Sequence, residues 1–380
     1  MNGFFLKDDM NILRQKIIEK INEEGPITFE KFMEMALYEP GLGYYSSKKT
    51  EIGKSGDFYT STHLHYAFGA MIGRQILEMW EIMGRPKDFY IIEIGAGAGY
   101  MCKDILDYFN KIFLKNISYV IVENNPFMKN KQMELLEVHL DKIEWVSSLN
   151  ELNNFKGCIV SNELLDAFPV HLVEMEDELK EIFVSVDKDI FIEIKKSPST
   201  PALTDYLKEF SIKLPRGYRT EINLRIKDWL RTLNEILFEG FVMTIDYGYS
   251  AMDYYSEERN RGTLLCYHKH KLVEDPYINI GEQDITAHVN FSSVKKWGEE
   301  IGLKTVGFCQ QGAFLISLGI DEIIQELYNK SSDYLFEVAK IKRLIFPGTL
   351  GESHKVLVQY KGNGFPSLKG FSMKNQADRL

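Results

Sequence analysis

The sequence predicts an α/β fold built on a doubly wound, mostly parallel sheet, and two observations carry this prediction. From Phe89 onward, short apolar runs alternate with amphipathic helical segments, which is the pattern of parallel strands joined by right-handed crossovers. After Pro169 the alternation stops, and the runs HLVEM, KEIFVSV and DIFIEIK follow with polar links, as in an antiparallel insertion. A chain of 380 residues suits one large domain with elaborations, or two domains.

The part of the chain before the sheet is predicted to be mostly helical. Apolar residues recur at about 3.6-residue spacing in two segments, and a helix capped by Thr28 lies between them. A stretch rich in Gly, Ser and Thr follows that capped helix, and a loop of this length inside a compact protein is usually functional or disordered. Residues 1–84 should therefore form a helical segment with a lid loop. The expected helices span residues 10–21, 28–38 and 66–83.

The remaining elements follow the same patterns. The core is expected over residues 85–168 and 240–360, with an inserted α+β subdomain over 169–239. Residues 247–283 should form a long loop, and residues 361–380 a loose tail. Further helices are expected near residues 202–211, 222–238 and 291–301. The expected strands are residues 89–94, 119–123, 143–146, 156–161, 240–248, 314–318 and 355–360.

Charge and cysteine content exclude several kinds of protein. The 45 basic and 55 acidic residues leave a net charge of −10, which disfavours nucleic acid or anionic lipid as a general partner. The four cysteines form no C-x-x-C pair, so neither a metal site nor a disulfide framework is expected. No run approaches the roughly 18 apolar residues that span a bilayer, and residues 1–20 lack the pattern of a targeting segment. We therefore expect a soluble, cytoplasmic protein.

The sharpest motif is Gly95-Ala96-Gly97-Ala98-Gly99, at a strand-to-helix turn, with Glu93 just before it. Small residues there let the backbone approach a ligand, and the following helix offers free N–H groups. A nicotinamide site would have the spacing G-x-G-x-x-G, but Tyr100 stands where the last glycine would be. An acid beside the turn instead suits a cofactor with a cationic amino-acid part, S-adenosylmethionine. A tight turn without any ligand is the plain alternative.

Two further strand ends supply candidate cofactor contacts. Glu123 ends the second strand, where an acid can accept hydrogen bonds from both hydroxyls of a ribose. Ser147, Ser148 and Leu149 follow the third strand and are placed near the adenine by position only. Alone, each group could equally be a solvated acid or a polar turn. In phase with the glycine turn, Glu123 is the stronger candidate.

The fourth strand runs into Ser161-Asn162-Glu163-Leu164-Leu165-Asp166. Ligands of open parallel sheets lie outside the carboxyl ends of the strands, so Asn162 and Glu163 should face the cleft. Asp166 could share a helical face with Glu163, and the two carboxylates could orient a nucleophile. Capping of a helix by Asn162 is the alternative. Before the sheet, Gly56, Asp57 and Phe58 belong to a loop that could close over the cofactor and exclude water.

These motifs, in their order along the chain, resemble the MidA-type S-adenosylmethionine-dependent methyltransferases, whose mitochondrial members are complex I assembly factors that methylate an arginine. The resemblance implies a Rossmann-like class I methyltransferase core with an inserted subdomain on the substrate side. It implies cofactor contacts at Gly95, Gly97, Gly99 and Glu93, and matches Asn162, Glu163 and Asp166 to the motif after the fourth strand. It rests on YEPGLGYYS, GDFYTS, IEIGAGAG, SNELLDAFPVH, IDYGY, GTLLCYHKH, DITAHVNF, QGAFLISLGI and GESHKVLVQY.

The function that the resemblance implies is methylation of a protein arginine by in-line transfer from S-adenosylmethionine. A cofactor-binding assembly factor without activity and a nicotinamide-dependent oxidoreductase are the alternatives, and a homodimer is left open. The chain departs from the family pattern at Thr62-His63, where Pro-Glu is usual, and at Asn290, where Asp is usual. These departures bear on which substrate the protein recognises more than on whether it binds the cofactor.

Overall fold

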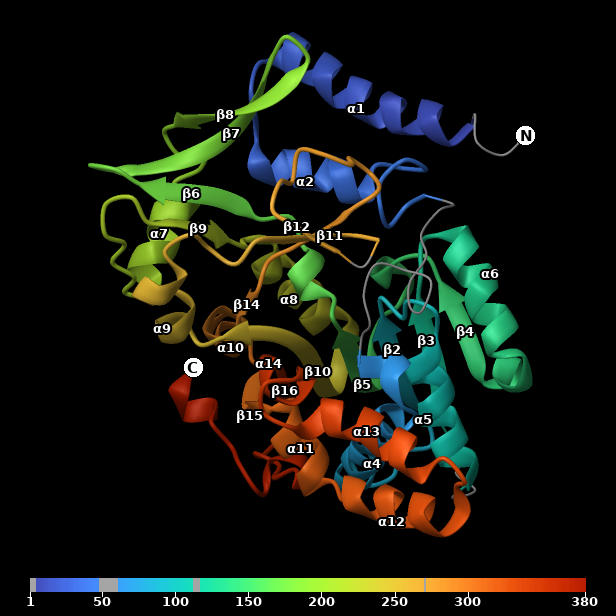
Figure 1. The fold of residues 1–380 in the computed structure, drawn as a ribbon. Helices are drawn as coiled ribbons and strands as arrows, with labels where there is room; N and C mark the ends of the chain where they lie inside the picture. Colours follow the sequence, from blue (N-terminus) through green and yellow to red (C-terminus); the bar gives the residue numbers. More distant parts are fainter. Residues whose placement is uncertain (1–4, 48–60, 112–116, 270) are drawn as a thin grey trace.

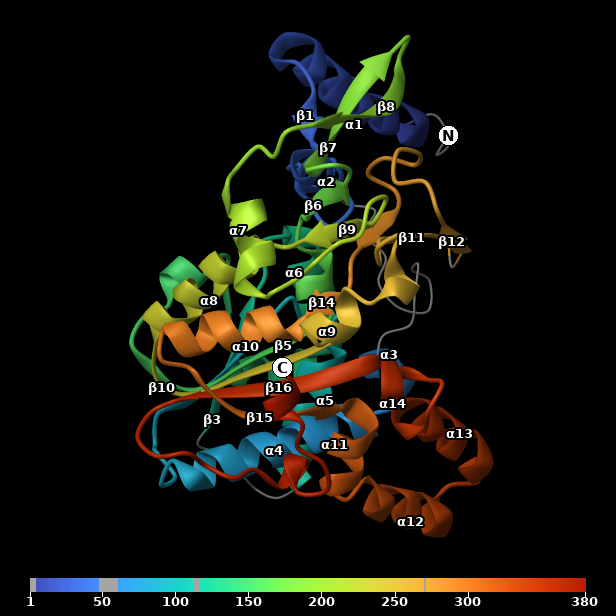
Figure 2. The ribbon, with the colours of Figure 1, turned by 90° about the vertical axis from the view of Figure 1, so that its left-hand side faces the viewer.

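The computed structural model describes residues 5–47, 61–111, 117–269 and 271–380, with side chains from residue 12 onward. Gly56, Asp57 and Phe58 of the expected lid lie outside the described residues. The predicted α/β architecture is confirmed, because a mostly parallel sheet carries helices on both of its faces (Figures 1 and 2).

The main sheet has the strand order β15-β16-β10-β5-β2-β3-β4, and a short strand β14 pairs with the end of β10. Strands β10, β5, β2, β3 and β4 pair in parallel, whereas β16 is antiparallel to both of its neighbours. The strands are β2 (Phe89–Ile94), β3 (Ile117–Val122), β4 (Ile143–Val146), β5 (Phe155–Asn162), β10 (Leu237–Tyr249), β14 (Val289–Asn290), β15 (Lys304–Gln310) and β16 (His354–Lys361).

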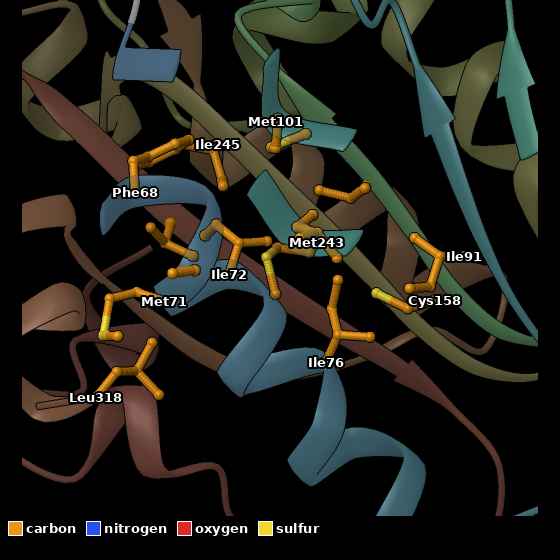
Figure 3. Close-up of a cluster of buried hydrophobic side chains, with 14 of the residues drawn as sticks. Phe68, Met71, Ile72, Ile76, Ile91, Met101, Cys158, Met243, Ile245 and Leu318 are labelled. Atoms are coloured by element: carbon orange, nitrogen blue, oxygen red, sulfur yellow. The ribbon is translucent and has the colours of Figure 1, made fainter. Parts of the chain in front are cut away.

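Each face of the main sheet is buried under its own helices. Successive residues of a strand point to opposite faces, so Ile91 joins the core beneath α4 whereas Ile92 joins the core beneath α8 and α10. Figure 3 shows the first core, where Phe68, Met71 and Ile76 pack against the sheet. Figure 2 shows the sheet between the two sets of helices. These helices are α4 (Ala67–Ile82), α5 (Tyr100–Lys111), α8 (Arg225–Ile236), α10 (Phe291–Glu300), α11 (Gln311–Ser317), α12 (Ile320–Lys330) and α13 (Tyr334–Ile345).

A second sheet lies above the main sheet in Figure 1, beside the helices α1 (Phe5–Glu24) and α2 (Phe29–Tyr38). It is antiparallel, as expected for the insertion, and strand β1 from the N-terminal segment pairs with β7 of the insertion. Both segments also share one hydrophobic core. The expected boundaries near residues 84, 168 and 239 stay a prediction. The strands are β1 (Ile27–Thr28), β6 (His171–Met175), β7 (Leu179–Asp187), β8 (Ile190–Lys196) and β9 (Arg219–Ile222).

Three expectations for the last third of the chain differ from the structure: a strand, a loop and the C-terminal tail. The run 314–318 belongs to helix α11 instead of a strand, because a short apolar run has no period that separates a buried strand from a buried helix. The expected loop 247–283 contains the start of a third sheet, made of β11 (Leu265–His268), β12 (Lys271–Val273) and β13 (Asp284–Thr286). These strands are too short to produce a clear alternation.

The expected loose tail, residues 361–380, is packed on the protein. Leu368 and Phe371 are buried, and the Phe371 ring lies 5.3 Å from the ring of Phe314. The backbone N–H of Gly370 donates to Gln75 Oε1 at 3.0 Å. The segment is polar and rich in glycine, as a loose tail would be. Its two buried apolar side chains, Leu368 and Phe371, nevertheless pack it against the protein. In the described part of the chain, no helix has the length and apolarity needed to cross a bilayer.

Candidate functional site

A pocket of about 280 Å³ opens at the carboxyl ends of β2, β3 and β5, where the crossover helices begin. This is the edge at which open α/β sheets bind ligands. The pocket is lined by residues from each strand end and from the N-terminal segment: Tyr38, Tyr45, Ser46, Thr62, His63, Glu93, Ile94, Gly95, Ala96, Gly97, Val122, Glu123, Asn124, Met128, Ser147, Asn162, Glu163, Leu164 and Ala167.

The glycine turn forms one wall of this pocket. Gly95, Gly97 and Gly99 have φ angles of 73°, 53° and 92°, in the left-handed region that glycine tolerates best. Gly95, Ala96 and Gly97 line the pocket, as expected, but Gly99 does not. A side chain at Gly99 would begin 3.3 Å from Leu136 Cδ1, so this glycine lets the segment after α6 (Pro126–Leu135) pack against the turn.

Glu93 reaches the pocket from the buried end of β2. Its Oε2 accepts a hydrogen bond of 2.6 Å from the hydroxyl of Tyr119, on the neighbouring strand. Burial raises the pKa of Glu93 to about 7, and the Tyr119 hydrogen bond acts in the opposite direction. The carboxyl group can therefore gain or lose a proton near neutral pH, and a cation in the pocket would favour its charged form.

Glu123 is held at the tip of β3 by two donors. Its Oε1 accepts from the backbone N–H of Asn125 at 2.8 Å, and its Oε2 accepts from Gln132 Nε2 at 3.0 Å. Gln132 Nε2 also donates to the carbonyl of Gly97 at 2.8 Å, so one buried amide connects the glycine turn to the second strand end. The sequence reasoning missed Gln132, since a glutamine inside an amphipathic helix gives no signal of such a contact.

Of the three residues expected after the third strand, the structure places one in the pocket wall. Ser147 lines the pocket, whereas Ser148 and Leu149 do not. Ser148 caps the short helix η2 (Leu149–Glu151), because its Oγ accepts from the N–H of Asn150 at 3.2 Å. Leu149 packs against the hydrophobic core instead.

The end of β5 presents Asn162 and Glu163 to the pocket. Glu163 has a φ of 51° and its N–H donates to the carbonyl of Ile245, so the chain turns sharply before the short helix η3 (Leu165–Ala167). Glu163 Oε1 lies 3.3 Å from His354 Nε2, and it accepts hydrogen bonds of 3.3 Å from Asn162 Nδ2 and from the N–H of Ser61. Three segments of the chain thus meet at this carboxylate: the end of β5, the segment with Ser61 and the start of β16.

A buried carboxylate, Asp246, holds the turn in place from β10. Its Oδ2 accepts from the backbone N–H groups of Leu164, Leu165 and Asp166, at 3.2, 2.9 and 3.3 Å. These are the free N–H groups at the start of η3, so Asp246 acts as a cap from outside the helix. In the sequence, Asp246 is part of the block IDYGY, and no role is predicted for it. The contact joins residues too far apart in the chain for the pattern to reveal it.

Asp166 lies behind the pocket wall and shares no helical face with Glu163. The Tyr247 hydroxyl donates to its Oδ2 at 2.5 Å, and burial raises the pKa of Asp166 well above its ordinary value. Asp166 Oδ1 and Asn162 Oδ1 are buried and accept no hydrogen bond from any residue that the structure describes. Asn162 lines the pocket beside Glu163, so its unpaired acceptor and that carboxylate together favour a ligand that carries several N–H donors.

Aromatic rings close the opposite side of the pocket. Tyr38 and Tyr45 are stacked with centroids 5.6 Å apart, and the Tyr45 hydroxyl donates to Asp284 Oδ1 at 2.8 Å. His63 lies edge to face with Tyr100 at 4.8 Å, and burial lowers the pKa of its imidazole. Across residues 5–47, 61–111, 117–269 and 271–380, no group of three or more His, Cys, Asp or Glu side chains is arranged to hold a metal.

Residues 71–309 match the protein family described as "Putative S-adenosyl-L-methionine-dependent methyltransferase". The chain is 26% identical, over 87% of its length and 82% of the relative's, to the mitochondrial protein arginine methyltransferase NDUFAF7 homolog of Caenorhabditis elegans. It is 28% identical to the mitochondrial NDUFAF7 protein of Xenopus tropicalis, over 88% of this chain and 81% of the relative. The relatives' location contradicts the cytoplasmic one expected here. Acidic charge and free thiols suit any reducing compartment and do not specify one.

A solved structure carries the same fold together with a bound product of methyl transfer. A crystal structure from Burkholderia thailandensis bound to S-adenosyl-homocysteine matches with a TM-score of 0.92 and 27% identity, over 100% of this chain and 99% of that one. A native crystal structure from the same organism matches with a TM-score of 0.90 and 28% identity, over the same shares. From the family match over more than half of its length, this chain belongs to the S-adenosyl-L-methionine-dependent methyltransferases.

Proposed function

We propose that the chain methylates a guanidino nitrogen of an arginine in a protein substrate. The observation that carries the proposal is a single pocket with the glycine turn at one end and Glu163, beside the orphan acceptor of Asn162, at the other. The names of the relatives, protein arginine methyltransferases, support the same substrate. A guanidinium group presents several N–H donors in one plane, which suits a carboxylate and an amide oxygen together.

The cofactor is expected at the glycine end. Gly95, Ala96 and Gly97 offer backbone to it, Glu123 suits the ribose hydroxyls, and Glu93 suits a cationic group. The residues fit the cofactor, because the carboxylates lie beside a left-handed turn that leaves the pocket open. When bound, S-adenosylmethionine supplies a methyl group on a positively charged sulfur, which needs alignment more than activation. Positioning of this kind can contribute about 7–11 kcal/mol.

Glu163 is the residue expected to hold the substrate guanidinium. Hydrogen bonds to one carboxylate would draw the positive charge toward the nitrogens that it contacts and leave the remaining nitrogen free to attack. His354 and the N–H of Ser61 orient this carboxylate from the two sides. Asp166 contributes negative charge from behind the wall, and Tyr247 fixes its side chain. We therefore assign Asp166 a positioning role and Glu163 the direct contact.

His63, which stands where the family usually has Glu, is compatible with a cationic substrate. Burial lowers the pKa of its imidazole, so the ring is mostly neutral at pH 7 and does not repel a guanidinium. It borders the pocket through the short helix α3 (Ser61–Leu64). The substitution removes one acceptor from this wall, and Glu163 then carries more of the recognition.

The proposal predicts that Glu163→Gln loses methyl transfer and keeps the cofactor. Cell lysate is incubated with labelled S-adenosylmethionine and either protein, and labelled residues are identified by mass spectrometry. The wild type should label arginine, and the variant should be slower by about 100-fold, as expected for the loss of a charged contact at the reacting group. Calorimetry should give S-adenosyl-homocysteine affinities within about threefold of each other, since the backbone of the glycine turn is unchanged.

Two variants make the result specific. Glu178→Gln removes an exposed carboxylate in the second sheet region and should behave as wild type. Gly97→Leu places a side chain in the pocket wall and should abolish S-adenosyl-homocysteine binding while the protein stays folded. Label on lysine or on carboxylates, with none on arginine, would refute the arginine proposal. Cofactor binding without any label would favour an assembly factor that does not catalyse transfer.

A further inference from the structure

Two cations lie over the ring of Tyr249, outside the pocket described above, and a third lies beside one of them. The Arg259 Cζ atom lies 3.8 Å from the ring centroid, and Lys355 Nζ lies 5.9 Å from the same centroid. Lys374 completes the group, because its Nζ donates to Oε1 of Gln310, which is the cross-strand neighbour of Lys355. We call Arg259, Lys355 and Lys374 the basic cluster. They come from the segment after helix α9 (Ala251–Tyr254), from β16 and from the C-terminal segment.

The charges of the basic cluster are not compensated within the described residues, where no carboxylate oxygen lies within 4.0 Å of any of the three. Arg259 donates to the carbonyl of Asp253 and to the hydroxyl of Ser256, and Lys355 donates to the carbonyls of Glu352 and Ser353. All of these acceptors are neutral oxygens. The charges therefore remain available to an anion that approaches from outside.

Some other partly buried cations of the protein are paired with carboxylates, whereas Lys304 and Lys361 donate to backbone carbonyls. Arg219 contacts Glu193 at 2.6 Å, and Arg74 contacts Glu322 at 2.7 Å. A chain with a net charge of −10 has acids to spare, so the lack of a partner at the basic cluster is not a shortage of carboxylates. Paired cations elsewhere are the expected outcome of folding, because uncompensated charge is costly to bury.

The acidic side chains next to the basic cluster, Asp253 and Glu352, accept hydrogen bonds from groups outside the cluster. Asp253 Oδ2 accepts from the hydroxyl of Ser250 at 2.9 Å, and Glu352 Oε2 accepts from the N–H of Gly348 at 2.7 Å. Burial lowers the pKa of Lys355 to about 8, although the charge of Glu352 raises it. Burial, together with the charges of Arg259 and Lys355, lowers the pKa of the neighbouring His288 to about 4. The charged groups that act on His288 are therefore positive, whereas Glu352 and Asp253 partly offset the charge of Lys355.

The basic cluster is connected to the proposed acceptor site by a row of rings. His288 lies 5.0 Å from Tyr247 and 5.3 Å from Tyr249, and Tyr247 bonds Asp166. Lys355 directly follows His354, whose imidazole contacts Glu163. Figures 1 and 2 both show α9 beside the C-terminal segment, at the same side of the main sheet. A chain that enters the pocket could therefore reach the basic cluster with neighbouring residues.

We propose that the basic cluster binds an acidic segment of the protein substrate and so positions the arginine that enters the pocket. This inference rests on the proposed function, because it assumes a protein substrate. Two parts of the substrate then meet protein groups of opposite charge. The arginine contacts Glu163, and an acidic stretch contacts Arg259, Lys355 and Lys374. A substrate with the reverse arrangement would be repelled at both places, which gives selectivity through charge pattern.

A carboxylate-rich peptide fits these observations better than nucleic acid does. Binding of a nucleic acid backbone usually needs an extended basic surface, whereas three cations form a small spot on an acidic protein. The ring of Tyr249 already stacks with the guanidinium of Arg259, so it is engaged in holding that cation instead of offering a face to a base. Preferential binding of a single-stranded oligonucleotide would be an outcome against the proposal.

The direct test uses the full chain and a fluorescent peptide of Glu-Gly repeats that contains no arginine. Its matched probe is the Gln-Gly peptide of the same length, and binding is followed by anisotropy at 50 and 300 mM salt. The Glu-Gly peptide should bind about tenfold more tightly than the Gln-Gly peptide at low salt, and the difference should fall at high salt through screening. Carbodiimide cross-linking, which joins carboxylates to amines, should attach the peptide mainly to Lys355 and Lys374.

The variant that tests the basic cluster is Arg259→Gln with Lys374→Gln, and it should weaken Glu-Gly binding by about tenfold. Its control, Lys208→Gln with Arg231→Gln, makes the same change in net charge at exposed pairs on α7 (Ala202–Glu209) and α8, and should have little effect. Both variants should bind S-adenosyl-homocysteine as the wild type does, which shows that they are folded.

Each result decides the question. Equal binding of the two peptides, equal loss in both double variants, or cross-links spread over other lysines would each overturn the proposal. The readout contains no methyl transfer, so it is independent of the substrate atom. If the Glu-Gly peptide binds as expected but no arginine is labelled in lysate, the proposed function fails while the acidic-segment site stands.

Discussion

At the scale of single residues, the acceptor end of the pocket depends on pairs that hold carboxylates at defined positions. Glu163 leaves β5 in a left-handed conformation, and His354 and Ser61 contact its side chain. Asp246 collects three backbone N–H groups from the turn that follows. A non-glycine residue at positive φ is uncommon and persists where surrounding contacts compensate the strain. Here the contacts that compensate the strain at Glu163 are made by Ile245, Ser61 and His354, at the end of the pocket where we propose that the substrate binds.

The hydrogen bond between Tyr247 and Asp166 gives a prediction for pH dependence. Burial raises the pKa of Asp166 above its ordinary value, and the Tyr247 hydroxyl lowers it by donating to the charged carboxylate. Tyr247→Phe removes that donor, so the charged form becomes less favourable and the pKa rises. The acidic limb of the methyl-transfer rate should move up by about one pH unit.

The matched control for Tyr247→Phe is Tyr218→Phe, which removes a hydroxyl that donates to the carbonyl of Ser256 at 2.7 Å and lies away from the carboxylates of the pocket. Its pH profile should coincide with that of the wild type. An unchanged limb in Tyr247→Phe, with normal cofactor affinity by calorimetry, would mean that ionisation of Asp166 does not govern the rate.

At the scale of elements, the close packing of α4 on α5 explains a buried acid far from the pocket. A side chain at Gly69 would begin 2.5 Å from Asp104 Cβ, so the missing side chain lets the two helices approach. Asp104 is 9% exposed and lines a second cavity of about 670 Å³ between α4, α5 and α12. Burial raises its pKa to about 7, with Lys103 acting in the opposite direction.

Asp104→Asn should therefore stabilise the protein at high pH. The folded pKa lies above the ordinary value of 3.8, so the carboxyl contributes most to stability below about pH 4 and this contribution is lost as pH rises through 7. At pH 8 the amide avoids a buried charge, and the midpoint of thermal unfolding should rise by about 2 °C or more.

The difference between Asp104→Asn and the wild type should shrink toward pH 4, where the wild-type carboxyl is protonated. Asp107→Asn is the comparison on the same helix, and it should lower stability at pH 8, because Lys103 and His139 contact that carboxylate. A gain for Asp104→Asn that is the same at pH 4 and pH 8 would exclude burial of charge as its cause.

At the scale of the whole molecule, segments far apart in the chain close the fold around the main sheet. The N-terminal strand β1 pairs with β7 in the second sheet. The C-terminal segment packs against α11 and covers part of the core on that face of the main sheet. Gln376 donates its N–H to the carbonyl of Phe308 in β15 at 2.7 Å. The pocket itself is lined by the N-terminal segment and by the ends of four strands, β2, β3, β4 and β5. Both ends of the chain are therefore part of the cooperative unit.

Phe371→Ala should destabilise the whole protein. The Phe371 ring is 5% exposed, and a side chain at Gly307 would begin 2.1 Å from its Cδ2 atom, so the ring fills the space that this glycine leaves. Truncation of a buried Phe usually costs about 3–5 kcal/mol in the free energy of unfolding, and urea denaturation measures it. Phe365→Ala is the control, because that ring is 67% exposed and should cost less than about 0.5 kcal/mol. Similar midpoints for the two variants would show that the segment is loose after all.

Much of the pocket could be anticipated because strand ends of a parallel sheet lie at one edge. Gly95, Gly97, Glu123 and Glu163 each follow a predicted strand, and the structure brings them into one pocket. Ser148 and Asp166 were also expected in the pocket but do not line it, because the direction of their side chains could not be predicted from the sequence. Ser148 and Asp166 are adjacent to pocket residues in the sequence but turn toward a helix cap and toward Tyr247.

The sequence by itself determined the layered α/β order, the glycine turn after β2 and the antiparallel character of the strands after Pro169, since these follow from local periodicity and from the spacing of the glycines. Tertiary structure alone decided that Gln132 connects two strand ends, that Asp246 caps the turn after β5, and that the C-terminal segment is buried. The reason is physical: hydrogen bonds and packing between residues far apart in the chain leave no periodic trace in the sequence.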